Sequence, residues 1–108
     1  MVELPEPVKR YFDGSNAHDP DACAACFADD AIVRDERHEH RGVGAVREWM
    51  RDAIRRYGHT VQVLSSAETG DGVTVTGRVT GNFPGSPIVL RHSFFVAGGK
   101  IARLEIVP

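Results

Sequence analysis

The sequence predicts an α+β domain in which three helices pack on one face of an antiparallel sheet. In the first half of the chain, apolar residues recur at helical spacing. In the second half, apolar and polar residues alternate with a period of two, and glycine-rich turn signals separate most of the alternating runs. Helices that precede a strand meander are typical of α+β domains rather than of alternating βα folds.

Length and composition describe one ordinary globular domain. The 108 residues suffice for a single core, and a formal charge of −2 leaves no basic face for nucleic acid. No apolar run approaches the roughly 18 residues of a membrane span, and the N-terminal MVELPEPVKRYF has no leader pattern. Cys23 and Cys26 make a poor disulfide framework, which fits a reducing compartment. We therefore expect a cytoplasmic protein without a nucleic-acid or membrane partner.

Three helices are predicted in the first half. Residues 6–16 place apolar side chains at helical spacing. Asp19 and Pro20 then supply an N-cap and a first-turn proline for a second helix over residues 20–28. The third helix begins at Gly42 and carries apolar residues on one face and charged residues on the other, until Gly58 ends it.

The strands are predicted from alternation and turn residues. A brief strand over residues 31–35 follows the second helix, and a polar loop over residues 38–40 leads from it to the Gly42 helix. The remaining strand candidates cover residues 60–68, 73–80, 88–96 and 100–107. Turns at Thr69-Gly70-Asp71-Gly72 and Gly98-Gly99 join two pairs of these strands, and residues 82–87 form an irregular connection.

Several local motifs resemble the nuclear transport factor 2-like superfamily, and within it the SnoaL-like group. The motifs are Asn16-Ala17-His18-Asp19, Phe27-Ala28-Asp29-Asp30-Ala31, Gly42, Gly81-Asn82-Phe83-Pro84-Gly85-Ser86-Pro87 and Gly99-Lys100-Ile101. The resemblance covers essentially the whole chain as one domain, residues 1–108. It implies a cone-shaped half-barrel whose curved sheet encloses an apolar pocket, and a homodimer. It does not imply one function, because the family includes isomerases, cyclases, dehydratases and pure binding domains.

Asp35 and Tyr11 are the first candidate catalytic residues. The run Ala28-Asp29-Asp30-Ala31-Ile32-Val33-Arg34-Asp35 resembles the run that carries the proton-shuttling aspartate of ketosteroid isomerases. A carboxyl in an apolar pocket has a raised pKa and suits a general base. Tyr11 lies where the same enzymes keep an oxyanion-donating tyrosine. The alternatives are an Asp35 that caps a turn or pairs with an arginine, and a Tyr11 that is only a core aromatic.

His92 is the third catalytic candidate. It interrupts an apolar strand face at the place where the isomerases carry a protonated aspartic acid as second oxyanion donor. His92 matches that place if the following hairpin is one residue shorter than theirs, and otherwise Arg91 matches it. An imidazole there can donate a hydrogen bond to an oxyanion. The alternative is a core histidine with its own partners.

Four further residues are expected to contact a substrate. They are Trp49, Phe83, Phe94 and Asn16. For each of them a structural role is the competing interpretation, as part of the core or as a cap at the end of the first helix.

Two other chemistries receive little support. His38, Glu39 and His40 lack the spacing of a helical zinc motif, so we expect no metal. Cys23 and Cys26 have the spacing of a redox pair but lie on the predicted buried stripe, where they read as small core residues.

Two functions remain open. The first is a cofactor-free acid–base isomerase or cyclase that acts on a small apolar carbonyl compound, steroid-like or polyketide-like, with Asp35 moving the proton. The second is a non-catalytic ligand-binding or dimerisation module of the same fold.

Overall fold

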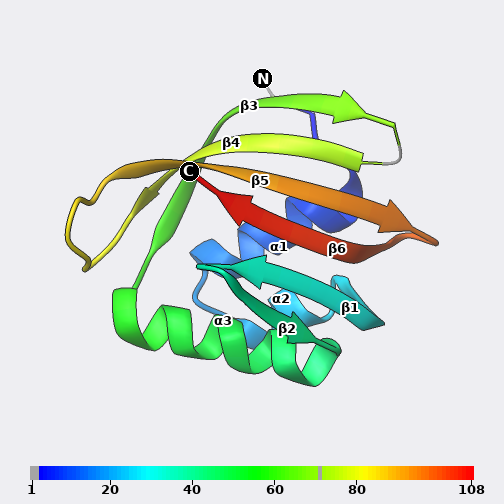
Figure 1. Ribbon diagram of the computed structural model, residues 1–108, viewed down its shortest axis with the longest axis horizontal. Helices are drawn as coiled ribbons and strands as arrows, with labels where there is room; N and C mark the ends of the chain where they lie inside the picture. Colours follow the sequence, from blue (N-terminus) through cyan, green and yellow to red (C-terminus); the bar gives the residue numbers. More distant parts are fainter. Residues whose placement is uncertain (1–2, 71) are drawn as a thin grey trace.

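In the computed structural model, which describes residues 3–70 and 72–108, a curved sheet wraps around three helices (Figure 1). The helices are α1 (Glu6–Asn16), α2 (Pro20–Ala24) and α3 (Val43–Tyr57). The strands are β1 (Phe27–Asp35), β2 (His38–Arg41), β3 (Thr60–Thr69), β4 (Gly72–Thr80), β5 (Ile88–Ala97) and β6 (Lys100–Val107). The predicted α+β class is confirmed. Asp71 of the predicted Thr69–Gly72 turn and Met1 and Val2 of the N-terminal segment lie outside the described residues.

All six strands form one sheet, in the order β2-β1-β6-β5-β4-β3. One feature corrects the antiparallel prediction: β1 runs parallel to β6, with Val33 opposite Leu104. Sequence alternation identifies strands but not their partners, and here the first and last long strands of the chain meet. Register shifts between Val63 and Ser65 and between Phe95 and Val96 add local bends of the kind that curve a sheet.

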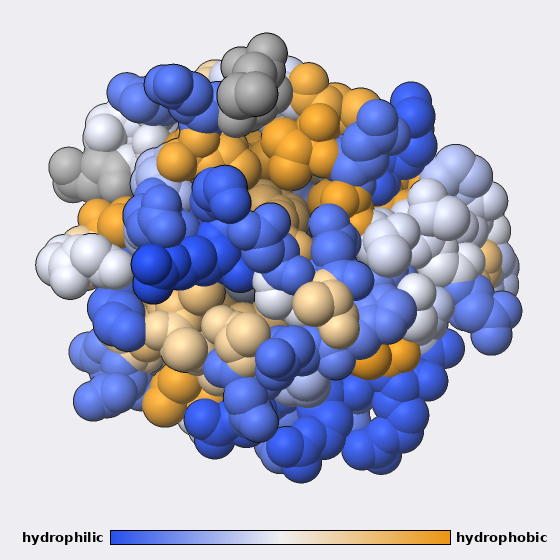
Figure 2. All heavy atoms as spheres, turned by 180° about the vertical axis from the view of Figure 1, so that it is seen from behind, coloured by the Kyte–Doolittle hydropathy of each residue, from blue (hydrophilic) through white to orange (hydrophobic). Residues whose placement is uncertain are grey.

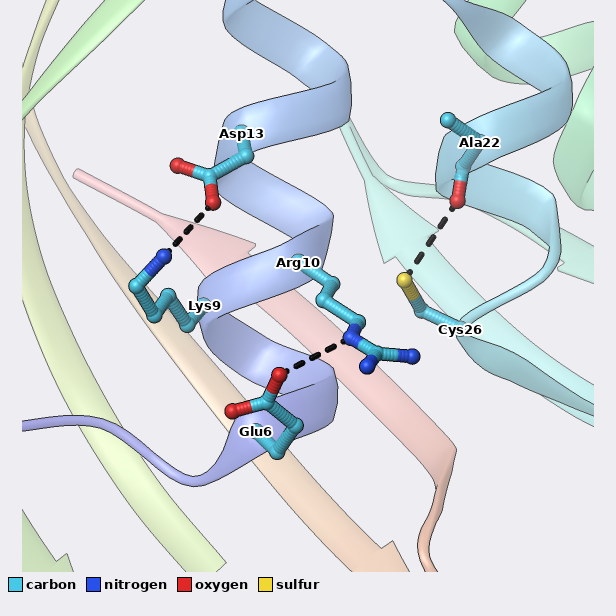
Figure 3. A network of polar contacts seen from close by, with 6 residues as sticks. All are labelled: Glu6, Lys9, Arg10, Asp13, Ala22 and Cys26. Atoms are coloured by element: carbon cyan, nitrogen blue, oxygen red, sulfur yellow. Dashed lines mark hydrogen bonds and ion pairs between the residues drawn. The ribbon is translucent and has the colours of Figure 1, made fainter.

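The first helix has the predicted bounds, and its two faces explain its position. Val8, Tyr11 and Phe12 are buried against the sheet. On the solvent side, Lys9 pairs with Asp13 and Arg10 with Glu6, each at 2.9 Å and four residues apart (Figure 3). Such exposed pairs stabilise a helix only slightly, so burial of the apolar face fixes α1.

The second helix is shorter than predicted. Asp19 caps it by accepting a hydrogen bond from the Ala22 amide at 3.1 Å, and Pro20 opens it as expected. The helix ends at Ala24 rather than at residue 28 because the chain already joins the sheet. The Cys26 carbonyl accepts a hydrogen bond from the Ile101 amide at 2.8 Å, and Phe27 begins β1.

The third helix begins after Gly42 and ends before Gly58, as the two glycines in the sequence indicate. Gly42 and Gly58 both have positive φ, 87° and 52°, which glycine adopts without strain. Val46 and Met50 are fully buried, whereas the opposite face is charged. Figure 2 shows the molecule from behind, with hydrophilic residues over much of its lower part and apolar patches higher up. In Figure 1, α3 lies at that lower level. None of the described helices is long and apolar enough to cross a membrane.

A short strand, β2, stands where a polar loop was predicted. It pairs with β1 through a two-residue turn, with Asp35 opposite His38. Glu36 and Arg37 both have positive φ, 52° and 66°, a pattern that Asn-Gly or Asp-Gly normally supplies in such a hairpin. Glu36-Arg37 is not such a sequence, so the turn could not be predicted from its residues. The strand β2 is also polar and largely exposed, and it lacks the apolar alternation that predicts a strand.

Candidate functional site

A cavity of about 420 Å³ lies between the inner face of the sheet and the helices α1 and α3. Most of its lining is apolar or aromatic, with contributions from every element except α2 and β2. Its polar side chains come from five separate segments and are Tyr11, Asp35, Glu36, Trp49, Tyr57, His59 and His92. The size and the few polar groups are typical of a small-molecule site.

Asp35 occupies the end of β1 where the strand reaches this cavity. Its Oδ2 accepts a hydrogen bond from the Trp49 indole Nε1 at 3.1 Å. Burial raises the pKa of the Asp35 carboxyl and the neighbouring Glu36 charge adds to the rise, while the Trp49 hydrogen bond opposes it. Within the described residues, Asp35 forms no ion pair with Arg34 or Arg37. The geometry favours a pocket carboxyl over a salt-bridged turn residue.

The turn after Asp35 brings a second acid to the cavity. Glu36 lines it, although the residue is exposed on its outer side. A non-glycine residue with positive φ carries a conformational cost of about 1 kcal/mol or more. The chain holds Glu36 in that conformation beside Asp35, and this places two carboxyl groups at the same wall.

Tyr11 lines the cavity from α1 and is only 3% exposed. Its ring packs edge-on against Phe12, Phe27 and Phe94, with centroids 5.2 to 5.8 Å apart. Burial raises the pKa of the phenol well above its ordinary value, so the group is a hydrogen-bond donor at neutral pH. Among the described residues, no hydrogen bond involves its hydroxyl, which leaves that donor for a ligand.

His92, not Arg91, faces the cavity. His92 is 3% exposed, whereas Arg91 is exposed and donates a hydrogen bond to the Pro108 carbonyl at 3.3 Å. Burial lowers the pKa of His92 to about 4, so the ring is neutral at pH 7. Its Nδ1 lies 3.4 Å from the Val75 carbonyl. A carbonyl only accepts, so the tautomer with its proton on Nδ1 is the one that forms this hydrogen bond, and that tautomer presents Nε2 as an acceptor.

Two of the four expected substrate contacts line the cavity and two do not. Trp49 and Phe83 form part of its aromatic wall. Phe94 is 1% exposed and packs in the core behind Tyr11. Asn16 is committed to the backbone of Val61, accepting from its amide at 2.7 Å and donating to its carbonyl at 2.9 Å. Asn16 therefore fastens α1 to β3, and it is not among the residues that line the cavity.

His59 is a cavity residue that the sequence analysis did not identify. It lies between α3 and β3, and its Nε2 is 3.2 Å from the hydroxyl of Ser15, which is 1% exposed. The His59 carbonyl accepts a hydrogen bond from His18 Nε2 at 2.8 Å. Burial lowers the pKa of His59, and the nearby His18 contributes. A single histidine in a short connection has no spacing signal, so only the fold could find it.

The two cysteines belong to the core. Both are free and buried, and Cys23 Sγ is directed to the Tyr11 carbonyl at 3.6 Å. Cys26 Sγ is directed to the Ala22 carbonyl at 3.4 Å (Figure 3). Burial raises the pKa of the Cys23 thiol to about 12 and also raises that of Cys26. Thiols of this kind are unreactive. The structure thus supports the core interpretation over a redox pair.

The polar segment after the turn is the strand β2. His38 and Glu39 are exposed on β2, and the His40 ring lies against Trp49 with centroids 6.1 Å apart. No group of three or more His, Cys, Asp or Glu side chains in residues 3–70 and 72–108 is arranged to hold a metal ion.

Comparison with known proteins agrees with this architecture. A candidate polyketide cyclase from Sinorhizobium meliloti is 42% identical, with a TM-score of 0.93 over 96% of this chain and 95% of that one. A cystatin-fold protein from Novosphingobium aromaticivorans is 22% identical, with a TM-score of 0.81 over 95% and 96%. A protein with a ketosteroid isomerase-like fold from Catenulispora acidiphila, solved with trimethylamine, is 18% identical, with a TM-score of 0.86 over 98% and 87%. None of the curated proteins matches significantly.

The family model for the SnoaL-like domain matches residues 8–104, nearly the whole chain. Together with the 42% identical structure, this match confirms the resemblance found in the sequence motifs. The chain belongs to the SnoaL-like family, within the nuclear transport factor 2-like fold.

Proposed function

We propose that the protein is a cofactor-free isomerase or cyclase that moves a proton on a small apolar carbonyl compound with a steroid-like or polyketide-like ring system. One observation carries the proposal: the Asp35 carboxyl lines an apolar cavity with a raised pKa and without a cationic partner among the described residues. A carboxyl of this kind is a stronger base when ionised than one in water. The 42% identical candidate polyketide cyclase supports the same class of substrate.

The proposed chemistry assigns one task to each polar group. Asp35 removes a proton from the carbon next to the substrate carbonyl. In an isomerisation it returns this proton at another carbon; in a ring closure the enolate carbon instead attacks a second carbonyl of the same substrate, and the proton passes to the alkoxide oxygen that forms there. The Tyr11 hydroxyl donates a hydrogen bond to the enolate oxygen that forms. His92 accepts a hydrogen bond from a substrate hydroxyl through Nε2, because its proton is held at the Val75 carbonyl. Trp49 and Phe83 enclose the apolar rings.

A thermal-shift screen tests the ligand class first. The panel contains steroids, aromatic polyketides, terpenoid epoxides and short acyl compounds. A ligand that binds only the folded state raises the melting temperature. We expect the ring ketones to raise it and to be turned over by the wild type but not by Asp35→Asn. Turnover by Asp35→Asn at the wild-type rate would contradict the assignment.

A non-catalytic binding or dimerisation module is the second candidate. The observation that favours it is the neutral His92 in place of a protonated acid, which leaves Tyr11 as the hydrogen-bond donor of that wall. A ring ketone that binds with clear stabilisation yet undergoes no proton exchange would favour this function over catalysis.

We also propose that the protein is a homodimer. Phe95 and Val89 are 44% and 46% exposed. In the sheet register, Phe95 lies opposite Arg103 of β6 and Val89 lies opposite Arg78 of β4. Phe95 also lines a shallow groove with Ser93, Arg103 and Glu105. Exposed apolar groups on a sheet face support association. Light scattering after size exclusion would give twice the monomer mass for the wild type and a monomer for Phe95→Ser.

A cytoplasmic location is proposed on the state of the cysteines. Cys23 and Cys26 are buried free thiols, a state that a reducing compartment preserves. Fractionation of the cells that make the protein would test this location.

A further inference from the structure

The Asp35 carboxylate has few partners for a charge in an apolar cavity. The Trp49 indole supplies one hydrogen bond, and the Glu36 backbone contributes another. A carboxylate has about four acceptor positions. None of the ion pairs among the described residues includes Asp35. Because an unpaired charge is costly in apolar surroundings, a ligand of opposite charge would relieve that cost.

The rest of the lining reinforces the negative charge. Glu36 lies on the same wall as Asp35. The imidazoles of His59 and His92 are neutral at pH 7, since burial lowers the pKa of both. Among the described residues, none of those that line the cavity is a lysine or an arginine. At neutral pH the lining therefore combines ionisable acids with no fixed cation.

The nearest arginines in the sequence are directed elsewhere. Arg34 and Arg37 are exposed beside Asp35 and do not line the cavity. Arg91 donates its hydrogen bond to the Pro108 carbonyl, next to the cavity rather than in it. These side chains lie outside the lining. The charged form of His40, whose ring lies beside Trp49, favours the Asp35 carboxylate, and the Glu36 side chain is also open to solvent.

Aromatic rings complete a wall that suits a cation. Trp49, Tyr57 and Phe83 line the same cavity as the two acids. Aromatic faces attract cations within about 6 Å of the ring centre, and tryptophan does so best. Tyr57 already shows this behaviour, because the guanidinium carbon of Arg56 lies 5.4 Å from its ring centre.

We propose that the ligand of this cavity carries a basic amine, whose ammonium group lies between the Glu36 carboxylate and the aromatic wall of Trp49, while Asp35 on the same wall stays free for the proton transfer. The inference rests on the proposed function, in which this cavity is the substrate site, and it narrows the substrate class to ring ketones that bear an amine. The same two carboxylates exclude ligands whose ring carries a carboxylate or a phosphate.

A charge-matched ligand series tests the proposal. The three probes share one naphthalene ring and are 2-acetylnaphthalene, 2-naphthylmethylamine and 2-naphthoate. Binding to the full chain is measured by calorimetry at pH 7.5 in low and in high salt. We expect the amine, which is protonated at this pH, to bind roughly tenfold more tightly than the ketone. The affinity for the amine should fall in high salt. Naphthoate should not bind. Naphthoate binding equal to that of the amine overturns the proposal, and so does a ketone that binds as tightly as the amine.

Two variants separate the cavity acid from general surface charge. Glu36→Gln removes a carboxylate of the lining, and Glu39→Gln removes an exposed one from neighbouring β2. We expect Glu36→Gln to weaken amine binding several-fold more than it weakens ketone binding. Glu39→Gln should change neither. Equal losses in both variants would reduce the effect to net charge and would overturn the proposal.

The outcomes also distinguish this inference from the proposed function. If ring ketones are turned over through Asp35 but the amine gains no affinity, the inference fails and the function stands. If the amine binds preferentially but Asp35→Asn leaves turnover unchanged, the function fails and the charge selectivity stands. Absence of binding by all three probes to the folded protein overturns the inference.

Discussion

The indole Nε1 of Trp49 donates a hydrogen bond to Oδ2 of Asp35 across 3.1 Å, and so joins α3 to the end of β1 at the cavity. The hydrogen bond favours the charged carboxylate, whereas burial disfavours it. We therefore expect Trp49→Phe to raise the pKa of Asp35 further. The measurement is a carbon-13 NMR titration of the Asp35 carboxyl.

Tyr57→Phe is the matched control for this titration. Tyr57 also lines the cavity but forms no hydrogen bond with Asp35. An unchanged Asp35 titration in Trp49→Phe, or an equal change in Tyr57→Phe, would contradict the role of the indole.

His92 makes the protein sensitive to acid. Its pKa is about 4 in the folded chain, below the ordinary 6.5, so the unfolded chain binds the extra proton between these values. The contribution of His92 to the free energy of unfolding is thus present above pH 6.5 and is lost as the pH falls toward 4. The loss is about 3 kcal/mol by linkage. We expect urea unfolding of His92→Gln to depend less steeply on pH over this range.

The comparison for His92→Gln is His38→Gln, which changes an exposed histidine of β2. Parallel pH curves for the wild type and His92→Gln would show that the buried imidazole does not contribute.

Asn16 fastens two elements, and its removal should affect stability rather than binding. Asn16→Ala breaks both hydrogen bonds to Val61 and leaves that backbone amide and carbonyl without the partner. We expect a loss of about 1–3 kcal/mol in the free energy of unfolding. Ligand affinity, measured well below the melting temperature, should stay the same. Asn82→Ala, at an exposed position in the β4–β5 connection, is the control. A loss of ligand affinity without a loss of stability would show that Asn16 contacts the ligand.

The Glu36-Arg37 turn places an acid at the cavity in a backbone conformation that lowers stability. Replacement of both residues, Glu36→Asn with Arg37→Gly, supplies the sequence that this hairpin turn prefers. We expect the free energy of unfolding to rise by about 1 kcal/mol and the selectivity for amines over ketones to fall. Arg37→Gly alone keeps Glu36 and should keep the selectivity. A double variant that is less stable than the wild type would show that the turn is not strained.

The predicted elements that are right are those with strong local signals. The helices over residues 6–16 and after Gly42 follow from apolar spacing and from glycines that end a helix. The strands after Gly58 follow from alternation. In contrast, the β1–β6 pair depends on contacts between distant parts of the chain. The β1–β2 hairpin was missed because Glu36 and Arg37 occupy turn positions that Asn and Gly usually take.

The site divides in the same way. Asp35, Tyr11 and His92 were found through the resemblance, and the structure brings all three to one cavity. The sequence could not assign the proton of His92, because that depends on the Val75 carbonyl of a neighbouring strand. Nor could it find His59, whose partner Ser15 is 44 residues away.

Asp35 also tests the link between activity and stability. The pKa of Asp35 is higher in the folded chain than its ordinary value of 3.8. Above pH 3.8 the unfolded chain therefore loses this proton more readily than the folded chain, and the free energy of unfolding falls as the pH rises. We expect Asp35→Asn to melt at a higher temperature than the wild type at pH 7. Asp30→Asn, at an exposed position of the same strand, should not gain stability. A lower melting temperature for Asp35→Asn would contradict the burial argument.

Asp35 is proposed to move a proton within the cavity. Proton NMR in deuterated water measures it directly, as the rate at which a bound ring ketone loses the proton next to its carbonyl. We expect exchange by the wild type and by Asp30→Asn, and at least about 10²-fold slower exchange by Asp35→Asn, which stays folded and still binds the ketone. Exchange at the wild-type rate in Asp35→Asn would show that this carboxyl is not the base.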